Sequence, residues 1–161
     1  MLLGSKTAVV YGAAGSVGSA VARAFARGAS VFLAGRRLEA VQMVADQIEE
    51  AGGTAHAASV DALDEAAVVA HADAVVERVG HLDISFNAIA VDHIQDVPLT
   101  RMTEAEVVGP VARRVATHLL TARAASSHMT AQGRGVIMTF TADAGRLAFP
   151  RWAASAWPAL P

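Results

Sequence analysis

Three glycines lie three residues apart near the start of the chain, in the stretch Tyr11-Gly-Ala-Ala-Gly-Ser-Val-Gly18. They follow a short apolar run and open a stretch with helical spacing. At such a junction Gly12 permits a tight turn, Gly15 lets the backbone approach a bound group, and Gly18 lets the helix pack close to the strand. The free N–H groups and the positive helix end attract an anion, which predicts a phosphate-binding loop.

The remaining residues of this loop fit the same interpretation. Ser16 offers a hydroxyl donor, and Val17 belongs to the same turn. The alternative is a tight strand-to-helix turn without a ligand, but the strand before the loop and the helix after it favour binding.

A second candidate binding feature, Arg36-Arg37, follows the second apolar run about 20 residues after the glycines. Domains that prefer NAD place an acidic residue there for the ribose 2′-OH, whereas arginine accommodates a 2′-phosphate. Two guanidinium groups suit bidentate phosphate recognition. We therefore expect NADP(H) rather than NAD(H). The alternative is that both arginines solvate the start of the next helix and pair with Glu39.

Short apolar runs alternate with helical stretches along the chain, which is typical of βαβ units around a parallel sheet. We expect an α/β fold with a Rossmann-like, doubly wound parallel sheet of five strands in the order 3-2-1-4-5. Residues 1–140 form the nucleotide-binding domain and 141–161 an irregular tail. The expected strands are Thr7–Gly12, Ser30–Ala34, Thr54–Val60, Leu82–Asn87 and Val136–Phe140. The expected helices are about Gly18–Arg27, Leu38–Ala51, Asp64–Val79 and Thr103–Met129.

Pro110 interrupts the last of these helical patterns. Proline lacks an N–H group and clashes with the preceding turn, but it is tolerated at the first position of a helix. We therefore expect a first short helix that ends near Val108 and a second helix that begins with Pro110.

Several stretches, taken in order, resemble the short-chain dehydrogenase/reductase family over about residues 3–150. They are Thr7–Gly12 for its opening strand, Val60-Asp61 after its third strand, Leu82–Ala88 for its fourth strand and Gly135–Phe140 for its fifth. The resemblance implies that Asp61 contacts the adenine and that Asn87 and Ala88 lie beside the cofactor. The alternative for Asp61 is a helper at the start of the third helix.

The resemblance also implies a catalytic set that this chain lacks. In that family a Tyr phenol protonates the substrate carbonyl, a Lys four residues later lowers the phenol pKa, and a Ser bonds the carbonyl oxygen. The only Tyr here is Tyr11 and the only Lys is Lys6. The family's positions fall on Ala142 for the Ser, about Ser155 for the Tyr, about Ala159 for the Lys and Arg113 for a structural Asn. Thr141 is the one hydroxyl left beside the Ser position, so we expect no intact catalytic set.

The family continues through a further helix and two strands, whereas this chain stops at Pro161. We therefore expect truncation or a change of reading frame after about Pro150, and a sheet without the family's last strands. Two functions stay open. One is an NAD(P)-dependent oxidoreductase of impaired activity on a small carbonyl or alcohol; the other is a catalytically silent dinucleotide-binding or oligomer-forming module.

Composition narrows the classes of partner. A net charge of −2 gives no reason to expect nucleic acid or an anionic membrane. No apolar stretch reaches the ~18 residues of a membrane span, and no signal peptide precedes the first strand. We therefore expect a cytoplasmic protein. The chain has no Cys, and its six His lack metal-ligand spacing, so we expect no metal site.

The last expected strand predicts self-association. Val136–Phe140 is apolar, and no later segment has strand character. Its edge would be a template for another chain. Apolar residues at helical spacing in the preceding helix, Val111, Val115, Leu119 and Ala122, add to this surface. We expect a homo-oligomer; the alternative is a monomer in which the tail, through Phe149, Trp152 and Trp157, covers both surfaces.

Overall fold

The computed structural model of the chain describes residues 3–90, 94 and 97–140. Thr141 and the expected tail lie outside the described residues. Five strands are present: β1 (Thr7–Tyr11), β2 (Ser30–Gly35), β3 (Thr54–Ser59), β4 (Ile84–Asn87) and β5 (Val136–Thr139). The helices are α1 (Ser16–Phe25), α2 (Leu38–Glu50), α3 (Glu65–Val79) and α4 (Glu104–Ala131), with a short 3₁₀ helix, η1 (Leu99–Arg101). Each strand and each of α1, α2 and α3 lies within two residues of its expected bounds, whereas η1 was not expected and α4 was expected as two helices.

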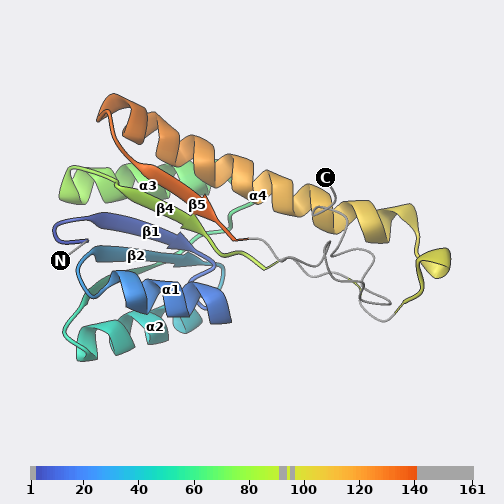
Figure 1. Cartoon of the computed structure of the whole chain (residues 1–161), viewed down its shortest axis with the longest axis horizontal. Coiled ribbons are helices and arrows are strands. Elements are labelled where there is room, and N and C mark those ends of the chain that lie inside the picture. Colours follow the sequence, from blue (N-terminus) through green and yellow to red (C-terminus); the bar gives the residue numbers. More distant parts are fainter. Residues whose placement is uncertain (1–2, 91–93, 95–96, 141–161) are drawn as a thin grey trace.

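The strands form one parallel sheet in the order β3-β2-β1-β4-β5, which confirms the expected topology. Helices α1 and α2 cover one face and α3 and α4 the other (Figure 1). Strand β1 is buried on both sides: Ala8 and Val10 pack toward α1 and α2, while Val9 and Tyr11 pack toward α3 and α4. A parallel strand covered by helices on both faces has a continuous apolar sequence, which is why β1 could be predicted from the sequence.

Helix α4 corrects the expectation of two helices. It runs unbroken from Glu104 to Ala131 with Pro110 inside it. A capping box between Thr103 and Glu106 fixes the start of the helix two turns before the proline. Gly109 precedes the proline, and because glycine has no Cβ, the clash that usually drives this residue out of the helical region is reduced. The proline therefore removes one backbone hydrogen bond but does not end the helix.

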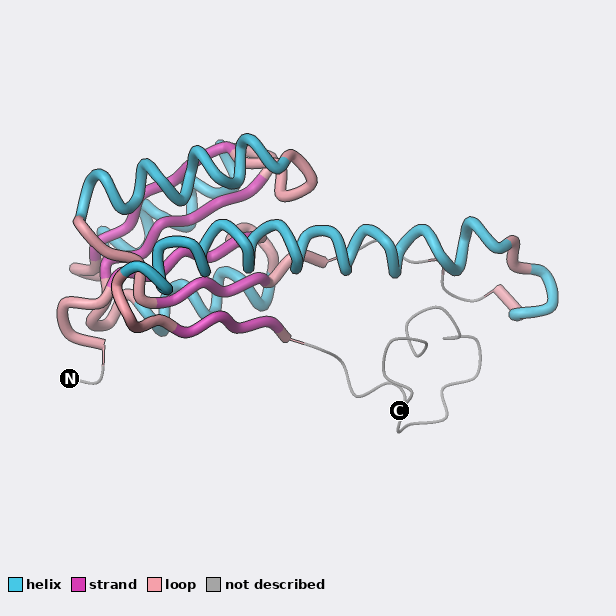
Figure 2. The backbone as a smooth tube through the Cα atoms, turned by 90° about the horizontal axis from the view of Figure 1, so that it is seen from above, coloured by secondary structure: helices cyan, strands magenta, loops and turns pink. Residues whose placement is uncertain are grey.

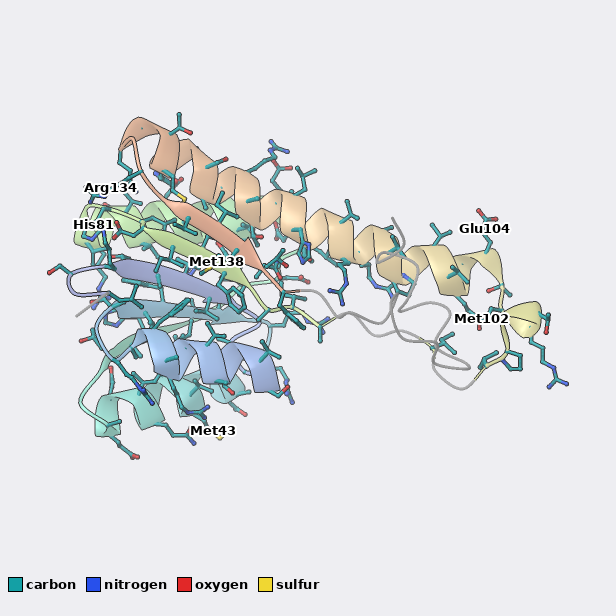
Figure 3. The ribbon with its side chains drawn as sticks, viewed as in Figure 1. Met43, His81, Met102, Glu104, Arg134 and Met138 are labelled. Atoms are coloured by element: carbon teal, nitrogen blue, oxygen red, sulfur yellow. The ribbon has the colours of Figure 1, made fainter. Side chains whose placement is uncertain are left out.

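The N-terminal part of α4 extends past the end of the sheet (Figure 2), where Met102 and Glu104 lie far from the strands (Figure 3). The helix has 28 residues, or about 42 Å at the usual rise per residue. Despite its length, neither it nor any other helix in the described part of the chain is apolar enough to cross a membrane.

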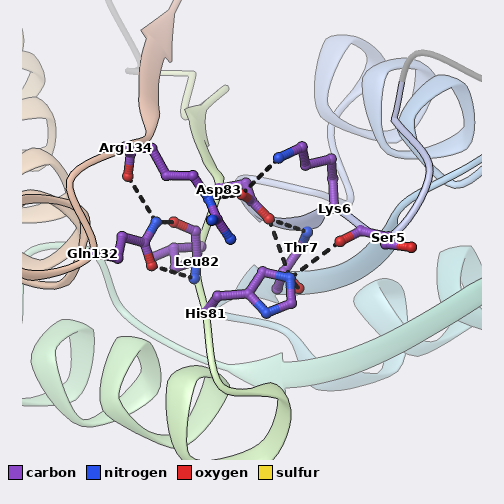
Figure 4. Close-up of polar contacts among 8 residues, drawn as sticks. All are labelled: Ser5, Lys6, Thr7, His81, Leu82, Asp83, Gln132 and Arg134. Carbon is purple, nitrogen blue, oxygen red and sulfur yellow. Dashed lines mark hydrogen bonds and ion pairs between the residues drawn. The ribbon is translucent and has the colours of Figure 1, made fainter.

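An ion-pair network ties three strands together at the amino end of the sheet (Figure 4). Asp83, which is 4% exposed, accepts hydrogen bonds from the Lys6 ammonium at 3.1 Å, the Thr7 N–H at 3.0 Å and Arg134 Nε at 3.2 Å. His81 Nε2 lies 3.2 Å from the same carboxylate. These residues precede or begin β1, β4 and β5. The Asp83 carboxylate therefore holds the first residues of the three strands next to one another.

Replacing Asp83 with asparagine is expected to lower the free energy of unfolding by about 2–3 kcal/mol. Breaking a buried pair by removing one partner costs ~3–5 kcal/mol, and the partly exposed Lys6 and Arg134 partners reduce that figure. Urea unfolding measures the loss. Asp46→Asn, at an exposed carboxylate on α2, is the matched control and should change stability by less than about 0.5 kcal/mol.

The Asp83 network also has a defined pH dependence. Burial alone raises the pKa of this carboxyl, but hydrogen bonds from the Thr7 N–H, Lys6 and Arg134 outweigh it and hold the pKa below its usual value. The unfolded chain therefore binds the proton more readily than the folded chain. The contribution is complete above the unfolded pKa of about 3.9 and is lost as pH falls below it. Equal losses for Asp83→Asn at neutral pH and at pH values below this pKa would contradict the assignment.

Candidate functional site

A cavity of about 600 Å³ lies at the carboxyl ends of the strands, at the opposite end of the sheet from Asp83. Its size falls within the range of small-molecule sites. Five segments line the cavity. They are Tyr11, Gly12, Ala14 and Gly15 at the end of β1 and the loop after it; Ala34 to Arg37 at the end of β2, with Val41 of α2; Val60 to Leu63 after β3; Ala88 to Ala90 after β4; and Arg113 and Thr117 of α4. The connection after β1 leads to β2 and the connection after β4 leads the other way, to β5, and ligands of open α/β sheets bind at such a switch point.

The glycine loop forms the wall of the cavity beside β1. Gly12 has φ of +75°, and a Cβ on it would lie 2.9 Å from the carbonyl carbon of Ala88. A Cβ on Gly18 would overlap the carbonyl oxygen of Gly12, so α1 packs directly against the turn. Gly15 is exposed at the cavity and is the N-cap of α1. Gly12 and Gly18 therefore provide the turn and the close packing that their spacing predicted, whereas the approach of a bound group at Gly15 stays a prediction.

The N-termini of the four helices differ in their caps. Side chains cap α3 through Asp64 and α4 through Thr103, whereas α1 and α2 begin at Gly15 and Arg37 with no side-chain cap. The first N–H groups of a helix have no partner within it. Those of α1 belong to Ser16, Val17 and Gly18, which form its first turn behind Gly15 and do not themselves line the cavity. Two uncapped helix N-termini thus border one cavity, an arrangement that favours anions.

Two arginines form the wall of the cavity beyond β2. Arg36 and Arg37 are both exposed, and neither makes an ion pair with Glu39. The backbone is fixed from the neighbouring strand, because Ser59 Oγ donates to the Arg36 carbonyl oxygen at 3.3 Å. Two exposed arginines therefore line the cavity, and the neighbouring strand holds the backbone of Arg36.

Asp61 supplies the one carboxylate in this lining. Its Oδ1 accepts a hydrogen bond from the Leu63 N–H at 3.0 Å, and its carbonyl oxygen accepts from the Asp64 N–H at 3.0 Å. These bonds form the turn that leads into α3, which fits the alternative reading of Asp61 as a helper at this helix start. The carboxylate also faces the cavity, so both roles are compatible.

Asn87 and Ala88 occupy different positions. Asn87 is buried; its Oδ1 accepts from the Ile89 N–H at 3.0 Å, and its Nδ2 donates to Thr121 Oγ1 at 3.1 Å. It therefore fixes the loop after β4 to α4 and does not line the cavity. Ala88 does line it, packed against Gly12.

Tyr11 and Lys6 lie at opposite ends of β1. Tyr11 ends the strand and borders the cavity, and burial raises the pKa of its phenol. Its ring contacts that of His71 edge to face, with 6.1 Å between the centroids. Lys6 precedes the strand and bonds Asp83. Five residues of extended chain separate the two by roughly 16 Å, so Lys6 cannot lower the phenol pKa.

Two residues of the cavity come from α4, and one of them had no signal in the sequence. The sequence indicated Arg113 only because this residue occupies the position of the family's structural Asn. Thr117 was not predicted, because its place depends on how α4 packs over β4. In the same helix His118 Nε2 lies 2.9 Å from Thr139 Oγ1 at the end of β5, and burial lowers the pKa of this imidazole. No cluster of three potential metal ligands occurs among the described residues.

These elements define a doubly wound α/β domain with a ligand-sized cavity at its switch point. The family profile described as short chain dehydrogenase matches residues 6–156, and the chain belongs to that family. Among curated proteins it is similar to glycine betaine reductase ATRR of Emericella nidulans, with 32% identity over 92% of this chain and 12% of the reductase. It is also 29% identical to D-threitol dehydrogenase of Mycolicibacterium smegmatis, over 91% of this chain and 56% of the dehydrogenase. The chain thus spans little more than half the length of the second and far less of the first.

Solved structures agree with this assignment. A metagenomic short-chain oxidoreductase, crystallised in complex with NADP, is 31% identical and superposes with a TM-score of 0.83 over 99% of this chain and 73% of that one. A short-chain type dehydrogenase/reductase from Mycobacterium marinum is 30% identical, with a TM-score of 0.84 over 98% of this chain and 65% of that one. The fold therefore matches proteins of this family over part of their length.

Proposed function

We propose that the chain binds NADP(H) in preference to NAD(H) at the cavity between the glycine loop and Arg36-Arg37, as the cofactor-binding part of a short-chain oxidoreductase. Bound NADPH would supply a hydride to the carbon of a small carbonyl substrate, with a proton going to its oxygen. The residues of this chain would hold the pyrophosphate at Gly15 and the first turn of α1. Arg36 and Arg37 would hold the 2′-phosphate.

One observation carries the proposal: two exposed guanidinium groups line the cavity after β2, where an NAD-specific domain needs a carboxylate. The glycine loop suits a phosphate because Gly15 lines the cavity at the uncapped N-terminus of α1, while Gly12 and Gly18 let the turn and the helix pack where added Cβ atoms would meet backbone. The NADP found in the metagenomic relative adds support, although it belongs to that protein.

Arg36→Ala and Arg37→Ala are each expected to weaken NADPH binding about tenfold or more while leaving NADH binding nearly unchanged. A hydrogen bond to a charged group contributes about 1.5–3 kcal/mol, and only NADPH carries the 2′-phosphate. Titration calorimetry with both cofactors measures the ratio. Arg27→Ala, at an exposed arginine beyond the far end of α1, is the matched control. An unchanged ratio in both variants would exclude these arginines as the phosphate site.

A second candidate is a nucleotide-binding module without catalysis. It is favoured by the separation of Tyr11 from Lys6 at opposite ends of β1, since neither position can provide an activated phenol at the cavity. The two candidates share the cofactor site and differ in turnover. NADPH oxidation with a panel of ketones and aldehydes separates them: binding with measurable turnover supports the oxidoreductase, and binding alone supports the module.

A further inference from the structure

A row of residues on one face of α4 leads from the end of β4 to the cavity. Thr121 Oγ1 accepts a hydrogen bond from Asn87 Nδ2 at the last residue of β4. Thr117, one turn before Thr121, is 4% exposed and lines the cavity, and Arg113, one turn before Thr117, lines it as well. Residues four apart lie on the same face of a helix, and each step of four advances by about 6 Å. The row therefore runs past the carboxyl end of β4 and brings Arg113 to the cavity.

Arg113 lies on a different side of the cavity from Arg36 and Arg37. These two arginines follow β2, whereas α4 packs over the end of β4, and β1 with its glycine loop lies between the two strands. Neighbouring strands are about 4.8 Å apart, so the ends of β2 and β4 are separated by about 10 Å. The cavity therefore has arginines on two sides.

The cofactor proposed above accounts for the arginines beside β2. Its 2′-phosphate is assigned to Arg36 and Arg37, and its pyrophosphate to Gly15 and the first turn of α1. Because a dinucleotide binds across the crevice at the switch point, its reactive end would lie on the β4 side, next to α4. Both phosphate sites are complete without Arg113, which lies where a carbonyl substrate would meet the cofactor.

The chemistry of Arg113 favours a carboxylate as its ligand. A guanidinium offers five N–H donors in a planar fork, and this fork can bond both oxygens of a carboxylate. One arginine balances the single charge of a carboxylate, whereas a phosphate group carries a charge closer to two and is better matched by a pair of arginines. The described lining holds three arginines and one carboxylate, that of Asp61, so the cavity as a whole attracts anions.

We propose that Arg113 binds a carboxylate on the substrate, and that the substrate is therefore an oxo acid, a carbonyl compound that also carries a carboxylate. This inference rests on the proposed function, because the cofactor site defines the side of the cavity that is left for the substrate. Arg113 selects and orients the substrate in this assignment and takes no part in proton transfer.

Titration calorimetry of 2-oxobutanoate into the full chain saturated with NADP⁺ tests the proposal. The oxidised cofactor has no hydride to donate, so binding is measured without turnover. The control ligand is 2-oxobutanamide, which has nearly the same shape but no charge. The acid is expected to bind about tenfold or more tightly than the amide, because hydrogen bonds between charged groups are stronger than those to a neutral group.

Arg113→Gln is expected to weaken binding of the acid about tenfold or more and to leave NADPH affinity unchanged. Arg113→Lys keeps the charge without the fork and should recover part of the loss. Arg114→Gln, at the adjacent arginine of α4 outside the cavity lining, is the matched control and should bind the acid as the wild type does. Arg113 is exposed, so its variants should keep the far-UV circular dichroism of the wild type.

Three results would overturn the proposal: no binding of the acid, equal binding of the acid and the amide, or equal losses in Arg113→Gln and Arg114→Gln. A loss of NADPH affinity in Arg113→Gln with unchanged binding of the acid would also overturn it, because Arg113 would then belong to the cofactor site. The same titrations without cofactor keep this failure separate from that of the proposed function. Absence of NADPH binding overturns the proposed function, whereas binding of the acid that depends on Arg113 still supports the carboxylate site.

Discussion

Gly18→Val is expected to lower the free energy of unfolding by about 3 kcal/mol and to reduce NADPH affinity at least tenfold. Any Cβ at this position meets the carbonyl oxygen of Gly12, which is backbone and cannot rotate away. Overpacking costs ~1–3 kcal/mol, and an immovable obstacle puts this site at the upper end. Relief requires α1 to move away from the loop, which displaces the N–H groups that would hold the pyrophosphate.

A control substitution separates the effect of backbone strain at a glycine from the effect of moving α1 away from the glycine loop. Gly80 ends α3 with φ of +83°, and a Cβ there has no neighbour within 4 Å. Gly80→Ala should therefore cost about 1 kcal/mol through its left-handed conformation and leave NADPH affinity unchanged. Urea unfolding and calorimetry, both at a temperature where each variant is folded, measure the two effects. Wild-type affinity in Gly18→Val would show that the packing of α1 on Gly12 does not support the site.

NADPH-dependent carbonyl reduction by this chain is expected to be about 10²–10⁴ slower than that of a family member in which a Tyr next to a Lys protonates the substrate, because a positioned general acid contributes a factor of this size. Burial raises the pKa of the Tyr11 phenol, which makes it a weaker acid, and Lys6 is engaged by Asp83 at the other end of the strand. Single-turnover measurement of NADPH absorbance, on protein of confirmed mass, gives the rate directly.

Tyr11→Phe is the variant that checks this explanation. It keeps the ring that packs in the core and against His71 and removes only the hydroxyl. Any residual rate should therefore be unchanged. A further tenfold loss of rate would show that Tyr11 donates the proton. A rate equal to that of a family member with the Tyr and Lys pair would show that another group donates it.

The sequence predicted the sheet and the glycine loop because their causes are local. Apolar runs such as Thr7–Tyr11 mark strands buried on both faces, and Gly12 and Gly18 are required by contacts within a few residues of each other. The strand order expected for a Rossmann-like sheet, 3-2-1-4-5, agrees with the structure.

The parts that could not be predicted depend on contacts between distant segments. Pro110 was expected to divide α4, but the capping box at Thr103 and the small Gly109 keep the helix continuous. Thr117 reaches the cavity only because α4 crosses the end of β4. Asp83 bonds Lys6, 77 residues before it, and Arg134, 51 residues after it, and no local sequence pattern predicts such a network.

Titration calorimetry of the full chain with NADPH and with NADH tests whether the cavity prefers the cofactor with a 2′-phosphate. Saturable binding of one NADPH per chain is expected, with binding of NADH at least tenfold weaker, since only NADPH carries the 2′-phosphate that Arg36 and Arg37 would bind. Equal affinities for the two cofactors, or no binding of either, would contradict it.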